Sequence, residues 1–268
     1  MICFPNTKVN IGLNILSKRS DGYHDIETIF YPVPFYDILE ILPSEDFELI
    51  NEGIRIDCPV ENNLCFKAYD LLLRNFKIGP VKIILYKNVP FGSGLGAGSS
   101  NAAHTLILLN KMFDLKIDNN ELTDLASLIG ADCAFFIKNR PVFATGIGNV
   151  FNDLNLDLRN KFIVICLPGV SVNTAAAYKN SVPSIPQKRI KDIINLPIKE
   201  WKYCLKNDFE DPVFDGYPDL IKIKNELYER GAEYAQMSGS GSAIFGIFDS
   251  IPEDFQLNSC KGIKIVRL

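Results

Sequence analysis

The stretch PFGSGLGAGSSNAAH, residues 90–104, says most about the fold of this chain. Four glycines alternate with other residues in its first half, at positions 92, 94, 96 and 98. Glycine lets backbone N–H groups approach an oxyanion without a Cβ in the way, and successive amides form an anion-binding nest. The residues from Ser100 to Phe113 predict a helix, whose N-terminal N–H groups favour the same anion. We therefore predict a phosphate-binding loop that leads into a helix.

The loop does not match the two commonest nucleotide-binding patterns. A Walker A loop ends in Gly-Lys followed by Ser or Thr, and no such ending occurs here. The Rossmann pattern GxGxxG also fails, because the sixth residue is Ala97 when counted from Gly92 and Ser99 when counted from Gly94. A flexible turn would also be rich in glycine, but the strand-like run before the loop and the helix after it favour an anion site. By itself the loop indicates phosphate binding and no particular reaction.

Other segments of the chain predict a mixture of strands and helices. KVNIGLNIL at 8–16 alternates apolar and polar residues, so we predict a half-buried strand with a polar second face. Residues 179–200 are rich in Pro and Lys and predict a loop with a short helix. Because strict βαβ alternation is lacking, we predict an α+β fold rather than a doubly wound sheet. Further strands are expected at 26–31, 37–42, 47–50, 81–89, 162–167, 243–248 and 262–267, and helices at 64–76, 121–129 and 219–230.

Composition excludes several classes of protein. The 268 residues carry a net charge of −4, which offers no electrostatic basis for binding nucleic acid or an anionic membrane. No apolar run approaches the roughly 20 residues that span a bilayer, and the N-terminus lacks the pattern of a signal peptide. Seven scattered cysteines without a CxxC motif, and only two histidines, argue against a structural zinc site. We expect a cytoplasmic protein with reduced thiols.

Three motifs occur in an order that resembles the GHMP kinases. The pattern PxxxGLGxxSSxA, which spans residues 90–102, resembles the second motif of this family. PNTKVNIGLNIL at 5–16 resembles the first motif, and MSGSGSAIFG at 237–246 resembles the third. GHMP kinases phosphorylate small metabolites such as galactose, homoserine and mevalonate, and they bind ATP at such a loop. The resemblance therefore implies a small-molecule kinase.

The resemblance also implies the two-domain GHMP kinase fold. We expect an N-terminal, ribosomal-protein-S5-like ATP domain at 1–155 and a C-terminal, ferredoxin-like domain at 156–268, with the active site between them. Phosphoryl transfer from ATP implies Mg²⁺ as well. No acidic cluster in the sequence offers a cage for that ion, so we expect phosphates and water to hold most of it and assign no metal-binding residue.

Further stretches resemble one branch of this family. KRSDGYHDIET at 18–28, IGADCAFF at 129–136 and PGVSVNTAAAYK at 168–179 resemble the branch that acts on cytidine-diphosphate methylerythritol in the non-mevalonate isoprenoid pathway. The resemblance implies that ATP donates its γ-phosphoryl group to the 2-hydroxyl of the methylerythritol moiety. Two alternatives stay open: another GHMP kinase, acting on homoserine or a sugar, and a non-catalytic nucleotide-binding sensor on the same fold. The sequence gives no expectation for the oligomeric state.

Lys8 and Asp132 match the catalytic pair of the family. In the implied roles, Asp132 accepts the proton of the attacking hydroxyl or orients that hydroxyl, and Lys8 contacts the γ-phosphate. Without the motifs, Lys8 would be an ordinary strand lysine and Asp132 a helix-terminal aspartate. Asn10 shares the strand face of Lys8, since side chains two apart point together, and is expected to contact the methylerythritol hydroxyls.

Tyr23 and His24, in the DGYH element, are expected to bind the cytosine base. A tyrosine ring can stack on the base, and a histidine can hydrogen-bond its polar edge. Tyr178 matches the position that supplies an aromatic ring to the other face of the base. Thr174, in the same stretch, is a further expected substrate contact. Taken alone, each of these residues would more commonly serve packing.

The remaining expected site residues surround the nucleotide. ENNL at 61–64 resembles a stretch that borders the adenine, and His104 is expected to be a surface or packing residue. Ala97, Ala134 and Asn149 depart from the residues that are frequent in the family, but none of these changes removes a catalytic group. The expected third-motif loop comprises Ser238, Gly239, Ser240 and Gly241. The expected ATP-binding residues are Asn63, Leu64, Pro90, Gly92, Ser93, Gly94, Leu95, Gly96, Ala97, Gly98, Ser99, Ser100 and Asn101.

Overall fold

The computed structural model describes residues 1–260 and 262–268 of the chain, and these residues pack into two compact units. The units alternate along the sequence, so the glycine-rich stretch contributes to both. The expected division at residue 155 stays a prediction, because compactness alone does not say which segments fold independently. The first unit combines 1–7, 35–91 and 96–140, and the second combines 8–34, 92–95 and 141–268.

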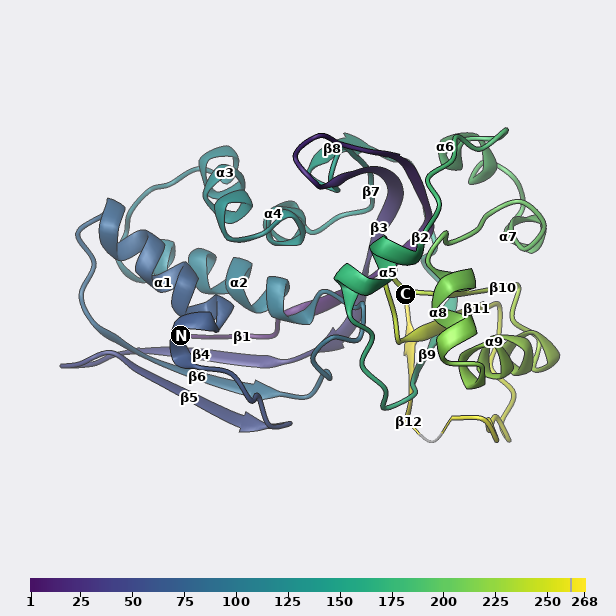
Figure 1. The fold of residues 1–268 in the computed structure, drawn as a ribbon. Coiled ribbons are helices and arrows are strands. Elements are labelled where there is room, and N and C mark those ends of the chain that lie inside the picture. The colour runs from purple at the N-terminus through teal and green to yellow at the C-terminus, as the bar shows by residue number, and fades with distance from the viewer. Residues whose placement is uncertain (261) are drawn as a thin grey trace. The chain divides into compact units, whose positions relative to one another are not determined.

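The first unit is a four-stranded sheet with helices on one face (Figure 1). The strands lie in the order β1-β4-β6-β5, with the bounds Ile2–Cys3, Ile38–Pro43, Val81–Lys87 and Glu48–Gly53. β6 pairs antiparallel with β4 and parallel with β5. Since β6 runs into the glycine-rich stretch, the sheet determines where that stretch begins. The helices are η1 (Val60–Asn62), α1 (Leu64–Asn75), α2 (Ala97–Met112), α3 (Asn119–Ile129) and α4 (Ala131–Lys138).

The second unit contains most of two further four-stranded sheets. One has the order β2-β3-β7-β8, with the bounds Asn6–Lys18, His24–Tyr36, Val142–Thr145 and Val150–Asp153. The other is antiparallel with the order β10-β11-β9-β12, with the bounds Tyr234–Met237, Ile244–Phe248, Phe162–Leu167 and Gly262–Arg267. α9 packs on β10 and β11 through its apolar face. The helices are α5 (Thr174–Asn180), α6 (Ile190–Ile193), α7 (Ile198–Trp201), α8 (Glu210–Gly216) and α9 (Asp219–Glu229).

Most predicted elements, and the α+β class, are confirmed. The elements that the sequence analysis missed are β1, β7, β8, β10, η1, α4, α5 and α8, which are two to eight residues long. Segments this short hold too few periods for a hydrophobic pattern to show. Where a loop with one short helix is expected at 179–200, the structure has the end of α5, the one-turn helix α6 and most of the one-turn helix α7. Across the described residues, every helix is too short or too polar to span a bilayer.

Strand β2 differs from its prediction. The alternation at 8–16 predicts an exposed polar face, but β2 is buried on both faces over its first ten residues. Lys8 and Asn10 are only 4% and 2% exposed. Their polar groups tolerate burial because neighbours bond them, as when Asn10 Nδ2 donates to Thr28 Oγ1 at 3.1 Å. The expectation of a half-buried strand is therefore wrong, since alternation does not reveal whether polar neighbours cover the polar face.

Candidate active site

The glycine-rich stretch forms a turn followed by helix α2. Gly92, Gly94 and Gly96 have φ values of 67°, 78° and 69°, a region that residues with a Cβ rarely adopt. Gly96 is the N-cap of α2, so the helix begins at Ala97, earlier than the expected start near Ser100. As a glycine, Gly96 has no side chain with which to cap this helix end. Its first N–H groups are the anion-binding element that the sequence predicts.

The third-motif loop contacts the glycine-rich turn within the second unit. Ser238 Oγ donates a hydrogen bond to Gly94 O at 2.9 Å, and Ala243 N donates to Ser93 O at 3.0 Å. A Cβ on Gly94 would lie 2.0 Å from Ser238 O, so only glycine fits there. Two motifs that lie 144 residues apart in the sequence are therefore in direct contact.

Lys8 and Asn10 join the same cluster from strand β2. Lys8 N donates to Leu95 O at 2.9 Å, and Asn10 N donates to Ser238 Oγ at 3.2 Å. The Lys8 ammonium group donates to Asn10 Oδ1 and lies 4.7 Å from the centroid of the Phe30 ring, a cation–π distance. The first, second and third motifs thus meet around Lys8 in the second unit.

Asp132 lies half-buried in the first turn of α4, a helix that the sequence analysis did not predict. A helix N-terminus favours a negative charge at this position. The adjacent Cys133 is fully buried, and burial raises the pKa of its thiol to about 12, although a hydrogen bond with Ser99 opposes the shift. The helix of Asp132 therefore packs beside the start of α2 within the first unit. Lys8 belongs to the second unit, so its pairing with Asp132 stays a prediction.

Asn63 and Leu64 lie at the start of α1. Asn63 Oδ1 accepts a hydrogen bond from Cys65 N at 2.9 Å, which makes Asn63 the N-cap of this helix. A Cβ on Gly98, in the first turn of α2, would lie 3.7 Å from Leu64 Cδ1. The N-termini of α1 and α2 are therefore neighbours in the first unit, which is the arrangement that the predicted ATP site needs.

His104 binds its own helix. Its Nδ1 lies 2.9 Å from Ser100 O and 3.4 Å from Ser100 Oγ, and Ser100 is fully buried. Burial lowers the pKa of His104, which favours the neutral ring. His104 is therefore a packing residue at the start of α2, one of the two roles that the sequence predicts for it.

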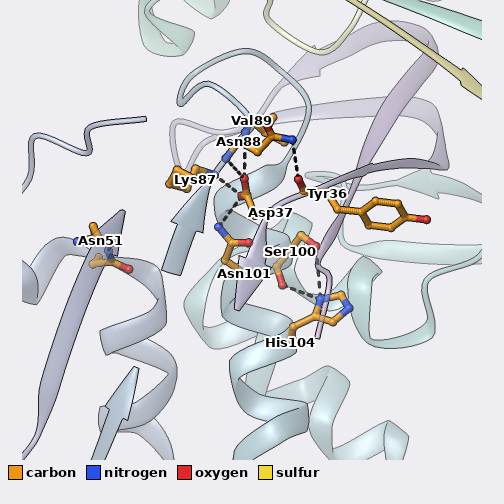
Figure 2. A network of polar contacts seen from close by, with 10 residues as sticks. Tyr36, Asp37, Asn51, Lys87, Asn88, Val89, Ser100, Asn101 and His104 are labelled. Carbon is orange, nitrogen blue, oxygen red and sulfur yellow. Dashed lines mark hydrogen bonds and ion pairs between the residues drawn. The ribbon is translucent and has the colours of Figure 1, made fainter. Parts of the chain in front are cut away.

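Asp37 is a candidate that the sequence analysis missed. Its carboxylate is fully buried between the two ends of the glycine-rich stretch (Figure 2). Oδ1 accepts hydrogen bonds from Asn88 N at 2.8 Å and Val89 N at 2.9 Å, just before the stretch. Oδ2 accepts from Asn101 Nδ2 at 2.9 Å, in α2, and from the Lys87 ammonium group. One carboxylate thus holds both ends of the predicted phosphate loop within the first unit.

Replacing Asp37 with Asn should lower the free energy of unfolding by about 3–5 kcal/mol, because Lys87 would remain buried without its counter-ion. Lys87 and Asp37 are 4% and 0% exposed. Urea denaturation of the wild type and the variant measures the difference. Adding Lys87→Met removes the unpaired charge and should restore part of the stability. A loss below about 1 kcal/mol, the range of surface ion pairs, would show that the carboxylate does not hold this region together.

A pocket of about 650 Å³ lies beside the DGYH element in the second unit. Lys18 and Lys179 contribute positive charge to it, and no Asp or Glu of the described chain is among its lining residues. Ammonium groups bind phosphate oxygens through charge-assisted hydrogen bonds, so the pocket suits an anionic ligand. Four of the predicted substrate contacts also line it: Tyr23, His24, Thr174 and Tyr178.

Aromatic rings form a chain along this pocket. The His24 and Tyr178 rings stack with centroids 4.8 Å apart and an interplanar angle of 17°. Tyr178 also meets the Phe209 ring edge-on at 4.7 Å. No base fits between His24 and Tyr178 at this separation, so in this arrangement a base would stack on an outer ring face. Tyr23, which is 62% exposed, offers such a face, and the predicted roles in base binding stay predictions.

Thr174 connects the pocket to the third-motif loop. Its Oγ1 lies 2.8 Å from Ser240 Oγ. The same loop reaches the glycine-rich turn through Ser238, as described above. Within the second unit, the third-motif loop therefore contacts the aromatic pocket at Ser240 and the glycine-rich turn at Ser238.

Family models and relatives identify the chain with one group of enzymes. The model for the GHMP kinases N terminal domain matches residues 63–140, and the model for the GHMP kinases C terminal domain matches 190–257. A 4-diphosphocytidyl-2-C-methyl-D-erythritol kinase of Parabacteroides distasonis is 50% identical over 259 residues, which cover 97% of this chain and 95% of the relative. The kinase of the same name from Cytophaga hutchinsonii is 46% identical over 260 residues, covering 97% and 96%.

Solved structures lead to the same group. A crystal structure of 4-(cytidine 5'-diphospho)-2C-methyl-D-erythritol kinase matches with a TM-score of 0.78 and 32% identity, over 92% of this chain and 90% of the other. A homoserine kinase from Cytophaga hutchinsonii shares the fold, with a TM-score of 0.64 and 17% identity over 92% and 86%. With three motifs meeting around Lys8 and relatives that align over nearly its whole length, this chain belongs to the GHMP kinases, in the family of the 4-diphosphocytidyl-2-C-methyl-D-erythritol kinases.

Proposed function

We propose that this chain transfers the γ-phosphoryl group of ATP to the 2-hydroxyl of 4-diphosphocytidyl-2-C-methyl-D-erythritol, a step of the non-mevalonate isoprenoid pathway. The observation that carries the proposal is the Thr174–Ser240 contact, which joins an aromatic pocket to the loop that meets the glycine-rich turn. An acceptor with a base at one end and a reacting hydroxyl at the other fits that order. Relatives named for this substrate, at about 50% identity, support the choice.

In the proposed reaction, the 2-hydroxyl oxygen bonds to the γ-phosphorus, the bond from that phosphorus to the bridging oxygen breaks, and ADP leaves. Asp132 takes the proton of the hydroxyl or orients it. Lys8 sets its ammonium group against the transferring oxygens, where negative charge must be stabilised. Asn10, whose side chain is bonded by Lys8 and Thr28, contacts the acceptor hydroxyls. Backbone amides of the glycine-rich turn and of the first turn of α2 bind the remaining phosphates.

The proposal includes Mg²⁺, which neutralises charge on the phosphates when it is bound. Within the described residues, no group of three or more His, Cys, Asp or Glu side chains could hold a metal ion. So sparse a donor set suits Mg²⁺, because this ion keeps several waters and binds through substrate phosphates. Of the two serines at the start of α2, Ser99 is the better hydroxyl ligand, since it is half-exposed whereas Ser100 is fully buried.

The two other readings of the sequence are less well supported. Kinases of homoserine or a sugar bind acceptors that carry no base, so they would not need a pocket lined by the rings of Tyr23, His24 and Tyr178. A non-catalytic nucleotide sensor would have no need of Lys8 and Asp132 together. We therefore keep both as outcomes of the test below.

A cytoplasmic location is part of the proposal. All seven cysteines are free thiols. Four of them are buried, and a fifth, Cys3, lies on strand β1. Proteins of oxidising compartments commonly pair their cysteines, so this usage supports a reducing compartment.

The test is an ADP-release assay with Mg-ATP and one acceptor at a time. We expect turnover with 4-diphosphocytidyl-2-C-methyl-D-erythritol, and none above background with homoserine or galactose. The phosphorylated position is read by ³¹P-coupled NMR of the product. Turnover with homoserine or galactose alone would assign the chain to another branch of the family. ATP binding without turnover on any of the three acceptors would favour the sensor.

A further inference from the structure

Residues 207–210, NDFE, belong to the second unit, and only Phe209 among them has appeared in the site described above, through its contact with the Tyr178 ring. The segment is paired with strand β2, because Leu13 N donates to Lys206 O at 2.8 Å and Asp208 N donates to Leu13 O at 2.9 Å. Asp208 Oδ2 also accepts from Ile15 N at 2.7 Å. NDFE is therefore attached to the strand that carries Lys8 and Asn10.

Asn207 bonds the third-motif loop with its side chain. Nδ2 donates to Met237 O at 2.8 Å and to Gly239 O at 2.7 Å, and Oδ1 accepts from Phe209 N at 3.0 Å. The residue is 3% exposed. Only a carboxamide supplies two N–H donors and an acceptor from one flat group, so no other side chain of this size makes the same three bonds.

NDFE makes a second hydrogen bond to Met237, the residue before the third-motif loop. Glu210 Oε1 accepts from Met237 N at 2.9 Å, while Lys224 Nζ donates to Glu210 Oε2 at 2.7 Å. Met237 is thus bonded on both its N–H and its carbonyl by NDFE. Its successor Ser238 donates to Gly94 O and accepts from Asn10 N. A shift of NDFE would therefore displace the contact between the third motif and the glycine-rich turn.

Phe209 extends the segment to the acceptor pocket. Its ring is 2% exposed and meets the Tyr178 ring at 4.7 Å with an interplanar angle of 86°, and Tyr178 in turn stacks on His24. Aromatic pairs prefer edge-to-face or offset arrangements, so Phe209 favours this orientation of the Tyr178 ring. One short segment therefore contacts both the loop beside the phosphates and the ring beside the base.

We propose that Asn207 and Phe209 are positioning residues for the phosphoryl transfer. Asn207 sets the backbone of residues 237–239 against the glycine-rich turn, and Phe209 sets the Tyr178 ring in the acceptor pocket. The inference rests on the proposed function, since it concerns the alignment of that donor with that acceptor. Small misplacements of reacting groups lower the rate of the chemical step strongly, which makes the alignment measurable.

The test compares Asn207→Leu with Asn14→Leu. Asn14 is a matched control, because it is also buried, at 7% exposed, and donates to Glu27 Oε1 at 2.9 Å without contacting the loop. We expect both variants to lose similar thermal stability. Only Asn207→Leu should lower kcat, by about 10²-fold. Only this variant should also speed amide hydrogen exchange in a peptide that covers 237–243, measured by mass spectrometry.

Two further variants keep the proposal open to refutation. Asn207→Asp has the same shape but turns the two donors into acceptors, so it should show the same kcat and exchange effects even if Asn207→Leu does not fold. Phe209→Leu should raise the KM for the cytidyl acceptor and leave the KM for ATP unchanged. If Asn207→Leu or Asn207→Asp matched Asn14→Leu in both kcat and exchange, the positioning role would be overturned. A wild type that binds ATP but turns over no acceptor would refute the proposed function instead, and the exchange data would still report on the loop.

Discussion

Replacing Asp132 with Asn should reduce kcat by about 10²–10⁴-fold, the usual contribution of a positioned general base. Asparagine keeps the shape of the side chain but cannot accept the proton of the acceptor hydroxyl. Asp132 sits half-buried in the first turn of α4, and the amide remains compatible with that helix end, so the fold should survive. ATP binding should stay largely intact, because backbone amides and Lys8 carry the proposed phosphate contacts. Steady-state kinetics and calorimetric titration with a non-hydrolysable ATP analogue measure the two quantities.

A matched control for this variant is Asp124→Asn. Asp124 is an exposed carboxylate on the neighbouring helix α3, so the substitution removes the same charge from the same unit without touching the site. Its kcat should equal that of the wild type. Full activity of Asp132→Asn would mean that the proton acceptor has been assigned to the wrong residue.

Lys8→Met should lower kcat/KM by about 10²–10³-fold, the cost of removing one preorganised group that stabilises developing negative charge. Methionine fills nearly the same volume, so the packing against the Phe30 ring can persist. The backbone bond from residue 8 to Leu95 O is unaffected by the side chain. Because the charge acts on the transferring group, the loss should fall on kcat more than on the affinity for ADP.

Lys82→Met serves as the comparison for Lys8→Met. Lys82 lies on β6 in the first unit, where its ammonium group pairs with Glu48 at 3.0 Å near the surface. This variant changes the net charge by the same amount and should keep wild-type kinetics. If both lysine variants lost activity equally, the effect of Lys8→Met would be one of overall charge or stability, and the proposed phosphate contact would be wrong.

The expected base site illustrates how far sequence patterns reach. DGYH and PGVSVNTAAAYK predict an aromatic substrate site, and the structure places Tyr23, His24 and Tyr178 along one pocket. The direct stacking of His24 on Tyr178 was not foreseen. Ring orientation depends on neighbours such as Phe209, which lies 31 residues along the chain from Tyr178 and belongs to no recognised motif. The pattern therefore identifies the residues of the site and leaves their mutual geometry undetermined.

By itself, the sequence determined the family, the glycine-rich turn and most of the helices and strands. These features depend on local chemistry. Glycine favours the positive φ values found at Gly92, Gly94 and Gly96, and the periodicity of a long element shows within a few residues of sequence. Only the tertiary structure decided the burial of the polar face of β2 and the clamp around Asp37. It also showed the hydrogen bonds from Asn207 to the backbone of the third-motif loop. Each of these features depends on partners that lie far apart in the sequence. Asp37 and Val89 are separated by 52 residues, and Asn10 and Ser238 by 228. No local pattern specifies which buried polar groups will meet.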